Sequence, residues 1–418
     1  MALSLIRFWS KGWIETVYLT PTLHFHYFGF DWVTVPGNFV YLVFIVSGLA
    51  ALLLAIGWHY RVSALVFFLS FTFIELMEKT TYLNHYYFVS VISLLLLFLP
   101  AHCTFSVDAK KNEKLRAEFV PAWCIDVLKL MLAIVYIYAG LAKLNPDWLL
   151  KAMPLAIWLP SKADLPLLGG LMHKSWMAYL FSWVGAFYDL FIVFFLCLPA
   201  TRVFAYILVV VFHLLTAMLF PIGMFPYIMI VSTLIFFSSD FHERILGRIA
   251  TILQIDHKLF KNGVHYSNDS KLSPLILGAI MTFQLLFPWR HLILTDNVYW
   301  SERGYRFSWR VMLMEKTGYA NFKIVDGKTG QRFYVQNEDF LTALQQKEMS
   351  TQPDFILEYG QYLGRHFAAQ GHQNVEVYVE SYAALNGRKS QPFIAADVDL
   401  MKVSYSDLVN NHLSTLND

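Results

Sequence analysis

Lys143 is the side chain best placed to do chemistry, because it follows a long apolar run over residues 122–142. Within that run, Gly140 leaves room for a neighbour or a ligand to approach closely. An ammonium group in a poorly hydrated pocket loses solvation energy and gives up its proton more readily. The neutral amine could then act as a general base. His85, beside Asn84, ends another apolar run on the same expected side, so two proton-handling groups are predicted at one membrane level.

Other ionisable groups inside apolar runs have structural explanations. A charge within a bilayer is costly, so such groups usually face partners. Asp189, midway along 176–198, is expected to pair with a charge or a backbone group of another helix. His213 is more often a satisfied core residue than a catalyst in such a position. Glu75 and Lys79 stand four residues apart, which favours an ion pair on one helix face, or pairing with another helix.

The composition excludes a soluble globular protein. The chain has 418 residues, of which 57% are hydrophobic and only 15% are charged, whereas soluble domains carry about 25% charged residues. The formal net charge of +2 gives no indication of nucleic-acid binding. The three cysteines lack the spacing of metal ligands, so neither a disulfide framework nor a metal site is predicted.

Eight apolar stretches are interpreted as membrane-spanning helices, since about 20 residues cross the hydrocarbon core. They cover residues 38–57, 61–78, 85–100, 122–142, 176–198, 202–220, 221–237 and 273–290. The sequence therefore predicts a polytopic α-helical membrane protein, with an interfacial segment over 1–36 and a transmembrane domain over 37–294. Basic residues gather in the loops of one side, which is predicted to be cytoplasmic. Lys143 and the C-terminal region are then on the outer, periplasmic or lumenal side.

Residues 295–418 have an ordinary soluble composition and are predicted to form a small α+β domain outside the membrane. The segment 322–335 alternates around Asp-Gly and Thr-Gly pairs, which predicts a β-hairpin. The segment 353–370 has the pattern of an amphipathic helix, and 374–380 has the strict alternation of a strand.

Several motifs around these residues resemble the vitamin K-dependent γ-glutamyl carboxylase family. They are Glu75-Leu-Met-Glu78-Lys79-Thr80 with Asn84-His85, Tyr138-Ala-Gly-Leu-Ala-Lys143-Leu-Asn-Pro-Asp147-Trp148, Phe212-His213 with Phe220-Pro-Ile-Gly223-Met224-Phe225, and Gly304-Tyr305-Arg-Phe-Ser308-Trp309. These matches occur in order over most of the chain. The chain resembles a short, microbial-type member, because the animal enzymes carry a much longer outer region.

The resemblance implies an enzyme in which Lys143 deprotonates reduced vitamin K, a membrane-soluble hydroquinone. Addition of O2 then leads to the epoxide through a strongly basic alkoxide, which removes a proton from the γ-carbon of a peptide glutamate. The resulting carbanion captures CO2, and a water-poor pocket protects the base from quenching. His85 would be a second catalytic group that holds or polarises the quinone oxygen. The matched motifs assign quinone binding to Asn84, Tyr138, His213 and Phe225.

The resemblance also assigns binding of the glutamate-containing peptide to a segment after the last apolar run. The residues concerned are Trp300, Tyr305, Trp309 and Met312. Their aromatic rings could equally form an interfacial belt. Nearby cations could attract a glutamate carboxylate, although solvated surface charge is the commoner explanation; they are Arg303, Arg306, Arg310 and Lys316.

Two alternative functions remain open from the sequence. A quinol epoxidase that no longer carboxylates would keep the same initiating base. A transporter, or a non-enzymatic lipid- or quinone-binding protein, would instead line a path with ionisable residues, namely Glu75, Lys79, Asp189 and His213. Recognisable inverted repeats are absent from the sequence, which weighs mildly against transport.

Overall fold

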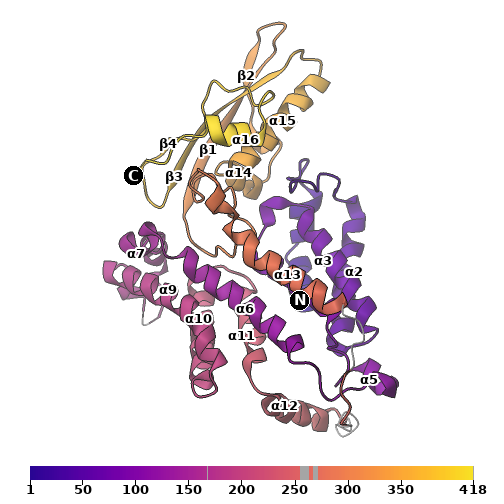
Figure 1. The fold of residues 1–418 in the computed structure, drawn as a ribbon. Helices are drawn as coiled ribbons and strands as arrows, with labels where there is room; N and C mark the ends of the chain where they lie inside the picture. Colours follow the sequence, from indigo (N-terminus) through magenta and orange to yellow (C-terminus); the bar gives the residue numbers. More distant parts are fainter. Residues whose placement is uncertain (167, 255–262, 267–271, 418) are drawn as a thin grey trace.

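The structure is a computed structural model that describes the chain except for residues 167, 255–262, 267–271 and 418. It has a helical part followed along the chain by a part that contains a β-sheet (Figure 1). In Figure 1 the sheet, in orange and gold, lies at one end of the helical part.

The helical part is built from the apolar runs of the sequence. Its longer helices are α1 (Ala2–Ser10), α2 (Val40–Ile56), α3 (Tyr60–Leu76), α4 (Asn84–Phe98), α6 (Trp123–Ala142), α9 (Ser175–Cys197), α10 (Arg202–Leu219), α11 (Phe225–Ser232), α12 (Ser239–Ile252) and α13 (Leu272–Leu286). Short helices lie in the connections, namely α5 (Val107–Lys111), α7 (Pro146–Lys151) and α8 (Leu155–Trp158). Asn145 caps α7 by accepting a hydrogen bond from the backbone nitrogen of Trp148, and Pro146 occupies the first turn of that helix.

Within the described residues, five helices are long and apolar enough to cross a membrane. They cover Gly37–Ile56, Trp123–Ala142, Ser175–Cys197, Arg202–Leu219 and Leu272–Ile293. Phe225–Phe236 and Ser239–Ile252 form a pair bent by 116°, which raises the number to six if the pair is one span. The predicted count of eight is not confirmed. The runs predicted over 61–78 and 85–100 form helices of only 17 and 15 residues.

Helices α6 and α9 pack closely because Gly140 has no side chain. A Cβ atom at Gly140 would lie 2.7 Å from Cγ and 2.8 Å from the backbone nitrogen of Leu190. Any other residue would therefore push the two helices apart, since packed interiors leave no spare volume. This close approach brings the end of α6, at Lys143, next to the middle of α9, at Asp189.

The C-terminal part is a four-stranded antiparallel sheet with helices packed against it. The strands are β1 (Lys316–Val325), β2 (Arg332–Tyr334), β3 (Glu376–Leu385) and β4 (Gln391–Pro392), in the order β2-β1-β3-β4. The helices are α14 (Ala343–Met349), α15 (Pro353–Ala369) and α16 (Tyr405–Asp407). The predicted hairpin is confirmed, with Val325 opposite Arg332, and so are the predicted amphipathic helix and strand.

The two parts share buried contacts. Phe25, within the segment predicted to be interfacial, is fully buried in the core of the C-terminal part. Lys79 lies after α3, and its Nζ is 3.0 Å from Glu358 and 3.4 Å from Asp354, both in α15. Among the described residues, the carboxylate partners of Lys79 are therefore in α15, and the ion pair with Glu75 does not form.

Candidate functional site

Lys143 is buried and forms an ion pair with Asp189. Its Nζ lies 2.5 Å from Oδ2 of Asp189 and 3.3 Å from the backbone oxygen of Ala139. Each of the two charged residues is only 6% exposed. The expectation that Asp189 pairs with a group of another helix is confirmed, and its partner is the candidate base itself.

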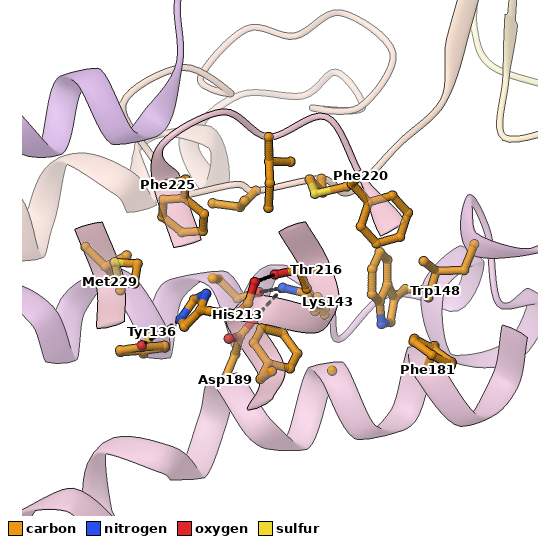
Figure 2. A pocket seen from close by; sticks show the side chains of 18 of the residues that line it. Tyr136, Lys143, Trp148, Phe181, Asp189, His213, Thr216, Phe220, Phe225 and Met229 are labelled. Atoms are coloured by element: carbon orange, nitrogen blue, oxygen red, sulfur yellow. Dashed lines mark hydrogen bonds and ion pairs between the residues drawn. The ribbon is translucent and has the colours of Figure 1, made fainter. Parts of the chain in front are cut away.

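The ion pair lines a cavity enclosed by α6, α9, α10 and α11 (Figure 2). The cavity holds about 90 Å³ of space, which is less than the roughly 300–1,000 Å³ of small-molecule sites. Large apolar side chains form most of the wall, including those of Trp148, Trp158, Phe181, Phe212, Phe220, Phe225 and Met229. The polar side chains that face it include Lys143, Asp189 and His213. Such a wall suits a flat apolar ligand that carries a few polar atoms.

His213 has one ring nitrogen without a hydrogen-bond partner among the described residues. Its Nε2 lies 3.0 Å from the hydroxyl of Tyr136. Within the described part of the chain, its Nδ1 is buried and has no hydrogen-bond partner. A neutral imidazole has one donor and one acceptor nitrogen. If the Tyr136 hydroxyl donates to Nε2, then Nδ1 carries the proton and can donate it to a bound ligand.

Two effects act in opposite directions on the proton of Lys143. Burial among apolar side chains disfavours the ammonium form. The carboxylate of Asp189 favours the ammonium, and the sequence did not predict this contact. The pair shares a short N–O contact in a cavity with mostly apolar walls.

Tyr136 lines the cavity, whereas the sequence assigned quinone binding to Tyr138. The Tyr138 hydroxyl donates to the backbone oxygen of Leu285 and accepts from Nε1 of Trp289, outside the cavity lining. Tyr136 and Lys143 stand seven residues apart, which is two turns along one helix face. Helical periodicity therefore contained the signal that would have found Tyr136.

His85 and Asn84 lie near the cavity without contributing to its described lining. The ring of His85 is buried, and its centroid lies 5.9 Å from that of Phe225, which lines the cavity. Asn84 donates from Nδ2 to the backbone oxygen of Arg310 and accepts at Oδ1 from the hydroxyl of Tyr82. His85 is thus one aromatic ring away from the cavity, and the Asn84 amide is already engaged at both polar atoms.

The four residues assigned to peptide binding lie in different surroundings. Met312 lines the Lys143 cavity. Tyr305 lines a second, more polar cavity between the two parts of the chain. Trp300 is buried in the core of the C-terminal part, and Trp309 is buried in the helical core. Of the four, the structure therefore places Met312 beside the candidate base.

The backbone that carries these residues is strained. Glu302, Phe307, Trp309 and Met312 have φ angles between +52° and +61°, a region that non-glycine residues seldom adopt. Strain of this kind costs on the order of 1–3 kcal/mol per residue and gathers at functional sites. The strained segment therefore supports a functional role for this stretch of the chain.

Two family profiles match the chain. The HTTM domain matches residues 1–241, more than half of the chain. The lumenal domain of vitamin K-dependent gamma-carboxylase matches residues 269–415. The chain belongs to the vitamin K-dependent γ-carboxylase family. No solved structure matches it.

Family membership confirms the resemblance seen in the motifs. It supports a vitamin K-dependent carboxylase-like function for a membrane protein with a lumenal domain. It also implies reduced vitamin K and a glutamate-containing substrate. Lys143, Asp189 and His213 all lie in the HTTM match, whereas Met312 lies in the lumenal-domain match, so the cavity joins the two.

Proposed function

We propose that the chain couples oxygenation of reduced vitamin K to carboxylation of a peptide glutamate, and that the Lys143 cavity is where this occurs. The observation that carries the proposal is the buried Lys143–Asp189 pair in a cavity with mostly apolar walls. A family carboxylase needs a proton acceptor in a water-poor place, and this pair supplies one.

The lining residues fit a hydroquinone. The aromatic wall, including Phe225 and Trp158, suits the faces of a fused ring system. Nδ1 of His213 is an unused hydrogen-bonding atom on the same wall, so it can orient a quinone oxygen. When bound, reduced vitamin K supplies through its oxidation by O2 a base strong enough for the glutamyl γ-hydrogen, which side-chain bases cannot remove.

Lys143 would accept a proton at Nζ and Asp189 would stabilise the ammonium that forms. A carboxylate 2.5 Å away lowers the free energy of the ammonium that would form at Nζ. Asp189 also fixes the direction of Nζ, as does the backbone oxygen of Ala139. His85, behind Phe225, is proposed to support the quinone site.

The site would open toward the outer side of the membrane. Asp147 of α7, four residues after Lys143, accepts two hydrogen bonds from Arg388 of the C-terminal part. The hydroxyl of Tyr299 donates to the backbone oxygen of Ala142. These contacts hold the lumenal-type domain over the Lys143 end of α6. A peptide from outside and a quinol from the membrane would then meet there, with CO2 as the co-substrate.

The test is a coupled assay on the purified full-length protein. Reduced vitamin K, O2, labelled bicarbonate and a short Glu-rich peptide are supplied together, and both labelled peptide and vitamin K epoxide are measured. We expect both products. Epoxide without labelled peptide would replace the proposal with an epoxidase, and neither product from folded, quinol-binding protein would reject it.

A further inference from the structure

Four cations follow the last apolar helix, and three of them are paired. The pairs are Arg303 with Asp296, Arg306 with Asp354 and Lys316 with Glu302. All three side chains of the basic residues are at most 17% exposed. The alternative of solvated surface charge is therefore not what the structure shows for them.

Arg310, the fourth cation, has no carboxylate partner within the described residues. It is 6% exposed, and its Nε is buried without a hydrogen-bond partner. Its Nη1 donates to the hydroxyl of Tyr299 at 3.0 Å, and its guanidinium lies 5.3 Å from the centroid of the same ring. Among the side chains that the structure describes, a neutral phenol is therefore the one hydrogen-bond partner of this buried charge.

Such an arrangement is costly unless a ligand completes it. Arginine carries five N–H donors, and a buried charge without a counter-charge is strongly destabilising. Arg290 adds a second positive charge close enough to repel Arg310 electrostatically. The Nη1 of Arg290 is occupied by the backbone oxygen of Phe287 and the hydroxyl of Ser308. Arg310, by contrast, has a buried Nε without a hydrogen-bond partner among the described residues.

Arg310 lies next to the Lys143 cavity. The Tyr299 hydroxyl that accepts from Arg310 donates in turn to the backbone oxygen of Ala142, the residue before Lys143, at 2.8 Å. The two residues after Arg310, at 311 and 312, line the cavity. Asn84 holds the backbone oxygen of Arg310 at 2.8 Å. Two successive hydrogen bonds, through the hydroxyl of Tyr299, therefore connect the guanidinium to the backbone next to Lys143.

We propose that Arg310 binds the side-chain carboxylate of the substrate glutamate beside the Lys143 cavity. A guanidinium and a carboxylate match in shape and charge and form two parallel hydrogen bonds. The identity of the ligand rests on the proposed carboxylation. Bicarbonate has the same planar oxyanion chemistry, so the experiment separates the two sources.

The test compares the binding of two peptides that differ only in Glu or Gln at the acceptor position. Affinities are measured with the full-length protein in detergent, in bicarbonate-free buffer, for wild type, Arg310→Gln and Arg310→Met. Wild type should prefer the Glu peptide by on the order of 100-fold, and both variants should lose this preference. Arg303→Gln is the matched control, since it should keep the preference but melt at a lower temperature because Asp296 loses its partner.

The melting temperatures distinguish a ligand site from a structural arginine. Neither Arg310 variant should melt below wild type, because no carboxylate is left unpaired. Loss of folding in both variants, or a Glu preference that survives in them, would overturn the inference. Loss of the preference on addition of bicarbonate would assign the site to bicarbonate instead. If wild type carboxylates but binds both peptides equally, this inference fails and the proposed reaction stands. If wild type prefers the Glu peptide through Arg310 but does not carboxylate, the proposed reaction fails and this inference stands.

Discussion

The Lys143–Asp189 pair should behave as a buried ion pair. Removal of one of the two charges should destabilise the protein more than removal of both. At 2.5 Å, unit charges attract by about 7 kcal/mol at an effective dielectric constant of about 20. Desolvation offsets much of this, and removal of one partner from a buried pair costs about 3–5 kcal/mol. Asp189→Asn and Lys143→Met should each lower the free energy of unfolding by about 3–5 kcal/mol.

The double variant Lys143→Met/Asp189→Leu should recover most of the lost stability. Replacement of a buried pair by apolar residues of similar volume is often neutral or stabilising, so the coupling between the two positions should be about 3 kcal/mol or more. Activity should not recover, because no proton acceptor remains at this wall of the cavity.

The assay is thermal melting of the full-length protein in detergent, read beside carboxylation. A change of about 2 °C per kcal/mol predicts that each single variant melts about 6–10 °C below wild type. Asp189→Asn should also lower carboxylation by about 100-fold or more, the usual contribution of a positioned proton acceptor. Single variants that melt like wild type, or a double variant no more stable than the weaker single variant, would refute the buried pair.

Three further predictions use contacts on different elements. Gly140→Ala should push α6 from α9, lower stability by about 1–3 kcal/mol and reduce carboxylation, whereas Gly48→Ala, where a Cβ meets no atom within 4 Å, should do neither. Tyr136→Phe should lower the rate of epoxide formation about tenfold by removing the hydrogen bond to the cavity histidine, and Tyr138→Phe should not. A hydrogen bond to a carboxylate of α15 raises the pKa of His26, so its stabilisation is full below about pH 6.5 and is lost as the pH rises through the folded-state pKa. The melting temperature should therefore fall as the pH rises above about 6.5, and should fall less in His26→Gln.

Local patterns in the sequence predicted individual helices and strands better than they predicted the number of membrane spans. The hairpin over 322–335 and the helix over 353–370 were found because alternation and helical periodicity are local signals. The eight predicted spans were read from apolar runs in the same way. Two of those runs, at 61–78 and 85–100, form helices of 17 and 15 residues, because an apolar run does not fix where a helix begins and ends.

The site was predicted in part. Lys143, His213, Phe225 and Met312 were named from the sequence and line one cavity. The partner of Lys143 was not predicted, because Asp189 lies 46 residues further along the chain on another helix. No local pattern gives the rotation of one helix against its neighbour.

The cations of the substrate segment show the same limit. Four were named together, and no feature of the sequence separates Arg310 from Arg303, Arg306 and Lys316. Their different partners depend on how the segment folds on itself and against α15, because Asp296 and Glu302 lie in the segment and Asp354 lies in α15. Burial without a counter-charge is a property that only the folded chain reveals.

The most direct measurement compares wild type, Lys143→Ala and Lys151→Ala in the coupled assay, with labelled peptide and vitamin K epoxide quantified from the same reactions. Lys151 is a matched control, because its side chain is 51% exposed on the neighbouring helix α7. We predict that folded Lys143→Ala loses both products by about 100-fold or more, while Lys151→Ala retains both. Epoxide formed by Lys143→Ala at the rate of wild type would contradict the claim that this buried amine starts the reaction.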